Sequence, residues 1–365
     1  MEKKRNKIYV LAFAVLFFGL TLFAWIKPAD DFSATERRPL DQFPTLNAQT
    51  IFNGKFMSEF ESYTLDQFPL RDEFRSLKSM LHLYVYGQAD NNDVYIADGY
   101  VSKLDYPLSE KAMGGAVKKF QSIYSKYIEG SDAKVYYSII PDKNVFLAEE
   151  NGYPAYDFSD MQAYMQNNLS NMKYIEIADL LSLEDFYKTD THWKQECIQD
   201  VANRLANQMG VSLKAEYKTV TLDIPFYGVY YGQLALPIDA DTITYLEHDM
   251  FADCTIINHE NGKEIQMYNM DKAMGRDPYE MYLSGSLAVI TIENPNATSD
   301  KELVIFRDSF GSSLTPLLVE GYSKITILDA RYLNEMMIPK FVEFKNQDVL
   351  FIHSSSVINN ETAFK

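Results

Sequence analysis

One stretch near the C-terminus constrains the fold more than any other. Residues 303–306 (LVIF) form a short apolar run that is typical of a buried strand. A polar turn with Gly311 follows, and apolar residues return at helical spacing over 312–320. This order places Ser309 at the carboxyl edge of a sheet and at a helix N-terminus, where backbone N–H groups favour developing negative charge. A serine nucleophile requires this position, although a simple helix cap uses the same residue types.

The rest of the chain alternates between buried strands and amphipathic helices. The predicted strands are 134–140, 324–328 and 348–353, with a short candidate strand at 174–178, and the predicted helices include 111–128 and 198–209. Such alternation implies right-handed crossovers and a parallel sheet. We therefore expect an α/β fold in which helices flank a parallel sheet.

A β-rich pattern interrupts this alternation from about residue 217 to 295. Segments 254–259 and 264–268 flank a strong hairpin turn at 260–263, and we expect the whole stretch to be an insertion beside the site. It also contains an aromatic and glycine-rich segment that includes Tyr231. That segment suits a sugar-binding groove and a packed turn about equally well.

A second polar motif lies in mid-chain, where Asp190 and His192 are two residues apart. In an extended segment their side chains project to the same side. A carboxylate can then hold one imidazole nitrogen and leave the other free as a base. The alternative is structural: Asp190 caps the following helix while His192 and Trp193 pack beneath it.

Taken together, the segments 190–193 (DTHW) and 307–311 (RDSFG) resemble the DHHW family. That family is related to the alginate O-acetyltransferase proteins and, more distantly, to SGNH hydrolases. The resemblance runs from residues 36–40 (ERRPL) to 329–332 (DARY). Thr191 replaces the first histidine of the family's name, as in the alginate acetylation relatives, so the important Asp and His are both retained.

The resemblance implies that Ser309 is the nucleophile, His192 its base and Asp190 the partner that orients the imidazole. In SGNH hydrolases the serine comes first in the chain, whereas here it comes last. The resemblance therefore implies a circularly permuted SGNH hydrolase-like fold.

Further candidates surround the proposed nucleophile. The backbone N–H groups of Ser309 and Gly311 are candidate donors to an oxyanion. Gly285 lies in a segment that resembles the family and is a candidate to approach the same oxygen. Arg307 and Asp308 either orient an acceptor or form a surface ion pair.

Composition excludes several classes of function. The chain has 365 residues and a formal net charge of −17, which repels nucleic acid, so we expect no nucleic-acid partner. The five histidines are scattered without metal-ligand spacing, and we predict neither a metal site nor another cofactor. Cys197 and Cys254 are too few for a disulfide framework. A single bond between them is the alternative outside the cell, and buried free thiols are favoured.

The N-terminus predicts a membrane anchor. Basic residues at positions 3, 4, 5 and 7 precede the uncharged run 8–26, whose length of about 28 Å in a helix matches the bilayer core. Phe23-Ala24-Trp25 is too bulky for a good cleavage site, so an uncleaved, single-pass signal-anchor is favoured over a signal peptide. The expected order is an anchor (1–27), a linker and helical lead-in (28–90), and an extracytoplasmic catalytic domain (91–365).

The expected function combines these points. The resemblance implies a membrane-anchored O-acetyltransferase that modifies a cell-surface or exopolysaccharide through an acetyl-serine intermediate. It also implies that a membrane-bound O-acyltransferase partner supplies the acetyl group. One alternative is a carbohydrate acetylesterase with the same triad. Another is a non-catalytic scaffold or polysaccharide-binding subunit of an export complex.

Overall fold

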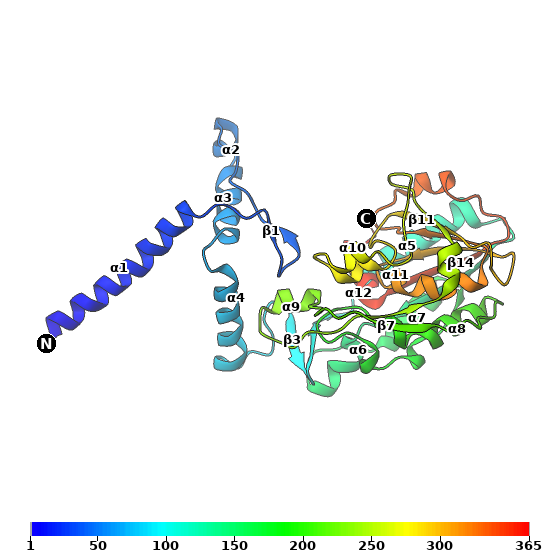
Figure 1. The fold of residues 1–365 in the computed structure, drawn as a ribbon, viewed down its shortest axis with the longest axis horizontal. Helices are drawn as coiled ribbons and strands as arrows, with labels where there is room; N and C mark the ends of the chain where they lie inside the picture. Colours follow the sequence, from blue (N-terminus) through cyan, green and yellow to red (C-terminus); the bar gives the residue numbers. More distant parts are fainter. Residues whose placement is uncertain (1, 365) are drawn as a thin grey trace. The chain divides into compact units, whose positions relative to one another are not determined.

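The computed structural model describes residues 2–364, and the chain divides into two compact units (Figure 1). The first unit comprises the chain up to Asn92 together with Tyr231–Pro237. The second comprises Asp93–Tyr230 and the chain from Ile238 onward. Both motifs singled out in the sequence belong to the second unit.

The first unit begins with α1 (Glu2–Ile26), drawn dark blue in Figure 1. Its segment Lys4–Ile26 has a mean hydropathy of 2.3 and is long and apolar enough to cross a membrane. A signal sequence near the N-terminus meets the same criterion. The helix is therefore compatible with the predicted anchor.

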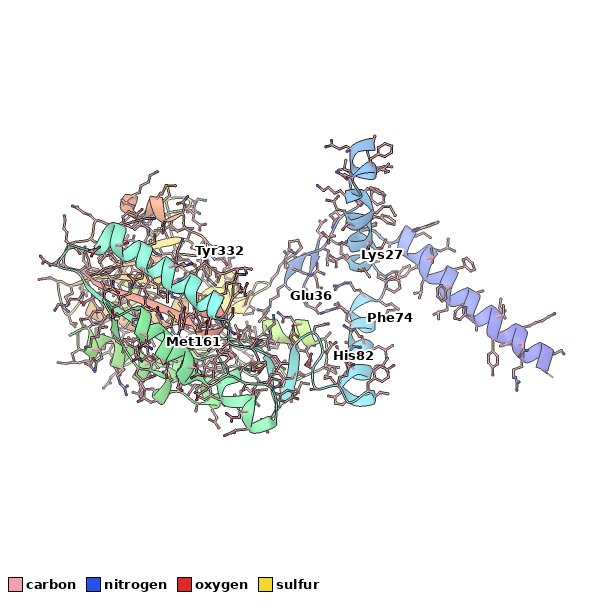
Figure 2. All side chains as sticks on the ribbon, turned by 180° about the vertical axis from the view of Figure 1, so that it is seen from behind. Lys27, Glu36, Phe74, His82, Met161 and Tyr332 are labelled. Carbon is pink, nitrogen blue, oxygen red and sulfur yellow. The ribbon has the colours of Figure 1, made fainter. Side chains whose placement is uncertain are left out.

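The rest of the first unit consists of short elements (Figure 2). They are β1 (Phe32–Ser33), β2 (Arg38–Pro39), α2 (Ala48–Phe52), α3 (Lys55–Asp66), α4 (Arg71–Met80) and η1 (Leu81–Val85). The strands β1 and β2 pair antiparallel. Gly54, in the left-handed region at φ 77°, separates α2 from α3.

An eight-stranded sheet forms the centre of the second unit, in the order β10-β9-β11-β13-β12-β14-β5-β6. Neighbours from β13 to β6 run parallel, whereas β11, β9 and β10 join by antiparallel pairing. The strands are β5 (Lys134–Ile140), β6 (Lys173–Tyr174), β9 (Thr255–Asn258), β10 (Lys263–Glu264), β11 (Val289–Glu293), β12 (Glu302–Arg307), β13 (Lys324–Leu328) and β14 (Asp348–Ser354). The parallel-rich α/β sheet is confirmed; circular permutation stays a prediction.

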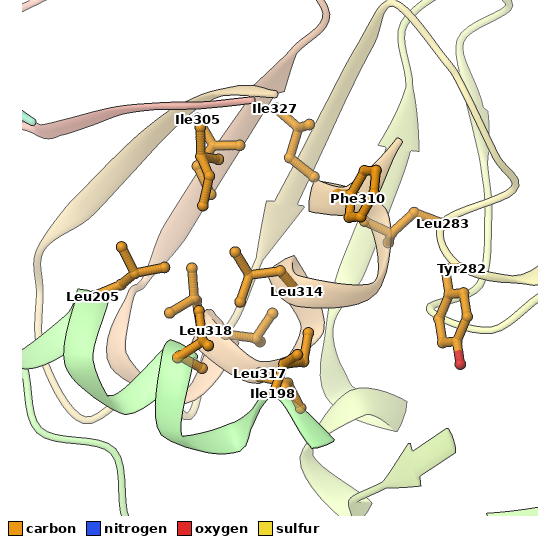
Figure 3. Packing of buried hydrophobic residues seen from close by; sticks show 14 of the residues in the cluster. Ile198, Leu205, Tyr282, Leu283, Ile305, Phe310, Leu314, Leu317, Leu318 and Ile327 are labelled. Carbon is orange, nitrogen blue, oxygen red and sulfur yellow. The ribbon is translucent and has the colours of Figure 1, made fainter. Parts of the chain in front are cut away.

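Helices cover both faces of this sheet because alternate strand residues point to opposite sides. Ile305 of β12 belongs to the same cluster as Leu205 and Leu318 (Figure 3), whereas its neighbour Phe306 packs with Phe120 and Met161 on the other face. The helices of the unit are α5 (Glu110–Ile123, continued by η2, Tyr124–Ile128), α6 (Asn144–Leu147), α7 (Phe158–Asn168), α8 (Gln199–Gln208), α9 (Val229–Leu234, shared with the first unit), α10 (Met270–Ala273), α11 (Phe310–Leu314) and α12 (Ser355–Ile358).

Smaller elements complete the second unit. Two antiparallel strand pairs lie outside the main sheet: β3 (Val94–Ala97) with β4 (Tyr100–Lys103), and β7 (Lys218–Thr221) with β8 (Thr244–Glu247). The short 3-10 helices are η3 (Glu149–Asn151), η4 (Ala178–Leu180), η5 (Leu183–Asp185), η6 (Gln195–Cys197), η7 (Asp249–Asp253), η8 (Pro278–Met281), η9 (Thr315–Gly321) and η10 (Glu335–Lys340).

Three details differ from the sequence-based expectations. The stretch 217–295 is only partly an addition, because β9, β10 and β11 extend the central sheet itself. The helix expected over 312–320 is α11 followed by the tighter η9, since Pro316 lacks the N–H that an α-helix needs. The strand expected at 174–178 stops early because the Glu176 carboxylate accepts the backbone N–H groups of the two residues that follow it.

Candidate active site

Ser309 lies at the turn between β12 and α11, as the sequence predicts. Its backbone is helical (φ −61°, ψ −24°) at the N-cap of α11. Asp308 and Phe310 on either side are buried, whereas Ser309 is only partly buried. The hydroxyl is therefore held in place by a rigid turn.

Asp190, His192 and Ser309 form a continuous chain of hydrogen bonds. The distance from His192 Nδ1 to Asp190 Oδ1 is 2.5 Å, and that from His192 Nε2 to Ser309 Oγ is 2.7 Å. Because a carboxylate only accepts, the Nδ1 position carries the proton of the neutral imidazole. Nε2 then accepts from the Ser309 hydroxyl, which is the arrangement a general base needs.

The Asp190 carboxylate is fixed by the backbone around it. Asp190 is 1 % exposed, and its Oδ1 also accepts the backbone N–H of His192 at 3.1 Å. Its Oδ2 accepts the N–H of Val229 at 2.9 Å. A carboxylate with these donors keeps one orientation, and it holds the imidazole in one tautomer.

Two buried charged residues support the loop that carries Asp190. The ammonium of Lys143 donates to the carbonyl oxygens of Tyr187, Lys188 and Asp190 at 2.9, 3.0 and 2.6 Å. The Asp241 carboxylate accepts the backbone N–H groups of Lys188 and Thr189 at 2.8 and 2.7 Å. Neither contact was predicted; the only sequence signal is the polar segment that ends strand 134–140.

An aromatic ring orients the imidazole from the side. The ring of Tyr279 stacks on His192 with centroids 3.8 Å apart and planes 9° apart. Tyr279 is itself anchored, because its hydroxyl lies 2.8 Å from Ser313 Oγ, which also accepts from Trp193 Nε1 at 2.9 Å. The sequence analysis missed Tyr279, although its segment was noted as resembling the family.

The backbone at the turn leaves one donor free. The Gly311 N–H, a predicted oxyanion donor, is bonded to the Asp308 carbonyl at 3.1 Å. The Phe310 N–H is bonded to Asp308 Oδ1 at 3.0 Å. Within residues 2–364 the Ser309 N–H has no hydrogen-bond acceptor, so it is the better candidate donor.

Arg307 and Asp308 are not a surface ion pair, because both side chains are fully buried. Arg307 donates to the Gly285 carbonyl at 3.2 Å and lies 3.6 Å from Asp329. Burial raises the pKa of Asp308, but Arg331 and the two hydrogen bonds from Ser354 outweigh that effect and hold the pKa below its usual value. These residues brace the turn from behind.

The other sequence candidates have less support. Gly285 neighbours Arg307, but its own N–H is bonded to the Tyr282 carbonyl at 3.0 Å. Tyr231 belongs to the first unit, and its part in substrate binding stays a prediction. Among the described residues there is no cluster of His, Cys, Asp and Glu able to hold a metal ion. Both cysteines are free thiols, but only Cys254 is buried.

Comparison with known proteins shows the fold. No protein-family model and no curated protein matches the chain. Among solved structures it is similar to a DHHW family protein from Eubacterium siraeum, with 20% identity, 75% of this chain and 94% of that chain covered, and a TM-score of 0.60. It is also similar to Bacillus cereus PatB1 with a sulfonyl adduct (17% identity, 76% and 100% covered, TM-score 0.57). The chain therefore shares the fold of these two proteins.

Proposed function

We propose that this chain is a membrane-anchored, extracytoplasmic O-acetyltransferase that uses Ser309 to acetylate a polysaccharide. The observation that carries the proposal is the hydrogen-bonded series Asp190–His192–Ser309, with 2.7 Å between the imidazole and the hydroxyl. The acetyl group and the sugar acceptor come from the resemblance to the DHHW family and its alginate-acetylating relatives. The likeness to the DHHW family fold supports that resemblance.

The reaction proceeds in two half-steps. His192 Nε2 takes the proton of Ser309 while Oγ attacks the acetyl carbonyl, and the Ser309 N–H stabilises the tetrahedral oxyanion. When the carbon–oxygen bond to the donor breaks, His192 returns the proton to the leaving group. A sugar hydroxyl then loses its proton to His192, attacks the acetyl-serine, and leaves as the O-acetylated sugar while Ser309 regains its proton.

Each supporting residue has one task in this scheme. Asp190 holds the Nδ1 proton and stabilises the imidazolium that forms during each step. Lys143 and Asp241 keep the loop of Asp190 in place, and Tyr279 keeps the imidazole plane fixed. A membrane-bound O-acyltransferase partner, which the resemblance implies, delivers the acetyl group to this side of the membrane.

The test uses the full-length protein in detergent with a small acetyl ester, with and without oligosaccharides. We expect acetylated sugar as the product and a loss of roughly 10³-fold or more in turnover for Ser309→Ala. Ser170→Ala, an exposed serine in the same unit, is the matched control and should keep full activity. Mass spectrometry should find the acetyl group on Ser309 when acceptor is withheld.

Each other result identifies a rival function. Release of acetate alone, unchanged by any acceptor, identifies a carbohydrate esterase with the same triad. Unchanged turnover in Ser309→Ala, or unchanged polysaccharide acetylation in cells that carry it, identifies a non-catalytic scaffold and overturns the proposal.

A further inference from the structure

The first unit exposes an unusual number of apolar side chains after α1. Phe52 is 90% exposed, Tyr84 72% and Leu65 65%, and the side chains of Phe43, Met57 and Val85 are similarly open. Large exposed apolar surface is typical of a membrane or protein interaction site. These side chains follow a candidate membrane-spanning helix within the same compact unit. A membrane lipid is therefore the first ligand to consider for this apolar surface.

An apolar cavity of about 690 Å³ places some of these side chains against α1 itself. Its walls include Leu16 and Leu20 of α1 together with Phe60, Tyr63 and Phe74 of α3 and α4. A helix needs about 20 residues to cross the hydrocarbon core. Residues 16–25 are the C-terminal half of the apolar segment Lys4–Ile26. With α1 as the proposed anchor, whatever shares a cavity with these residues lies at the depth of the outer leaflet.

Hydrogen bonds locate the water-facing boundary of that cavity. The Asp30 N–H donates to Gln67 Oε1 at 2.8 Å, and Gln67 Nε2 donates to the Asp30 carbonyl at 2.8 Å. Asp30 follows the end of α1 by four residues. On the same premise, Gln67 is tied to the point where the chain leaves the membrane, and we place the start of α4 at Arg71 at the level of the lipid headgroups.

A second cavity of about 300 Å³ adjoins the first, because Phe68 and Phe74 line both. Its polar wall carries Arg71, Arg75 and Lys78. The guanidinium groups of Arg71 and Arg75 lie 2.6 and 3.2 Å from the Glu36 carboxylate. Within residues 2–364 Lys78 pairs with no carboxylate, and its ammonium donates to Asn92 Oδ1 at 2.9 Å. Asp72 also lies 3.6 and 3.5 Å from the Arg71 and Arg75 guanidinium groups. Two carboxylates therefore face the two arginines, and in the described part of the chain Lys78 is the one cation of the three without a carboxylate partner.

We propose that the two cavities together bind one anionic phospholipid of the outer leaflet. The acyl chains fill the apolar cavity between α1, α3 and α4, and the phosphate pairs with the Lys78 ammonium beside Arg71 and Arg75. A lysine is well suited to a phosphate, as a compact charge with three donors. The proposal rests on one part of the proposed function, retention of the N-terminal helix, and it does not depend on the chemistry of Ser309.

The test uses the full-length protein in nanodiscs. Intact mass first establishes that residues 1–27 are present. Nanodiscs then contain a zwitterionic phosphatidylcholine with a trace of either photoreactive phosphatidylglycerol or photoreactive phosphatidylcholine. We expect the phosphatidylglycerol probe to label α3 and α4 around Phe60 and Phe74 at least about threefold more than the phosphatidylcholine probe. Glycerol phosphate and inorganic phosphate in solution should compete weakly, because they lack the chains.

Substitutions identify the headgroup contact. Lys78→Met should remove the preference for the anionic probe, and Lys78→Glu should reverse it. Lys55→Met is the matched control, because Lys55 is an exposed lysine of the same unit that pairs with Glu59 at 3.4 Å. It should leave the preference unchanged.

Several outcomes overturn the inference. Equal labelling by both probes, or an unchanged preference in both Lys78 variants, removes the headgroup site. Full competition by inorganic phosphate identifies a simple anion site, and cross-links to a second copy or a membrane protein identify a protein interface instead. A mass that lacks the first 26 residues removes a wall of the cavity. Ser309→Ala should keep the labelling, so loss of acetyl transfer and loss of lipid binding are separable.

Discussion

Tyr279 lies against the candidate triad but has no direct part in the proposed proton transfer from Ser309 to His192. Its ring stacks on the imidazole of His192, and its hydroxyl bonds to Ser313. Tyr279→Phe keeps the stacking and should stay within a few-fold of full turnover. Tyr279→Leu removes the flat surface and should lower kcat roughly 10- to 100-fold with little change in KM, because misplacing a catalytic group by a fraction of an ångström is costly.

The measurement is the acetyl-ester assay, with pH profiles of kcat for both variants. A positioning role predicts that the profile changes in Tyr279→Leu and not in Tyr279→Phe. Equal losses in the two variants, accompanied by equal loss of thermal stability, would show that Tyr279 acts only as a core residue.

His353 is a buried imidazole whose two nitrogens have no hydrogen-bond partner within the described residues. Burial lowers its pKa to about 4, with Asp308 and Asp329 opposing the shift and Arg331 adding to it. A lowered pKa in the folded state means that the neutral form is favoured on folding. The resulting stability is fully present above the unfolded value near 6.5 and is lost as the pH falls towards 4.

This gives a pH-dependent prediction. Between pH 7.5 and 4.5, protonation at His353 should lower the free energy of unfolding by about 2–3 kcal/mol. Urea unfolding of the wild type and His353→Phe at both pH values isolates this amount together with its coupling to Asp308 and Asp329, because the other carboxylates contribute equally to both proteins. If both proteins lose the same stability on acidification, the imidazole is not the group responsible.

At the scale of elements, the loop that carries Asp190 is supported by close contact with the segment that contains Gly228. A Cβ atom added at Gly228 would lie 2.3 Å from the Cα of Asp190, so only glycine fits there. Gly228→Ala should therefore push the Asp190 loop away, cost about 1–3 kcal/mol in stability, and reduce turnover much more than stability accounts for.

The control for this substitution is Gly115→Ala in α5, where an added Cβ meets nothing within 4 Å. Because alanine favours a helix, Gly115→Ala should be neutral or slightly stabilising and should leave turnover unchanged. Acetyl-ester turnover and urea unfolding measure both variants. Normal turnover in Gly228→Ala would show that the close contact between Gly228 and the Asp190 loop does not position Asp190.

At the scale of the whole molecule, the two cysteines report on global opening. Burial of Cys254 and partial burial of Cys197 raise the pKa of both thiols to about 11, which leaves little of the reactive thiolate at pH 8. The native protein should react slowly with iodoacetamide, and denaturant should expose two fast-reacting thiols without any reductant. A mass lower by two hydrogens before reduction would instead reveal a disulfide.

The sequence by itself determined the elements whose signals are local. Strand 134–140 appears with its predicted bounds, and the strand before Ser309 differs by one residue at each end. Apolar runs of four to seven residues bounded by polar turns have few other solutions, because their side chains must leave water and their backbone must stay hydrogen-bonded. Ser309 was visible for the same reason, because it follows such a run, whereas Asp190 and His192 were visible through their spacing of two residues.

Only the tertiary structure determined which side chains surround Asp190, His192 and Ser309. Lys143, Asp241 and Tyr279 reach the site from separate parts of the chain, and no local pattern links a lysine after one strand to the carbonyl oxygens of a loop 44 to 47 residues later. The sheet order also placed β11 beside β13, so residues expected in an insertion extend the central sheet. Short-range propensity determines which segments become strands, whereas burial of side chains distant in the sequence determines which strands become neighbours. The candidate site depends on the second effect, because its residues come from segments far apart in the chain.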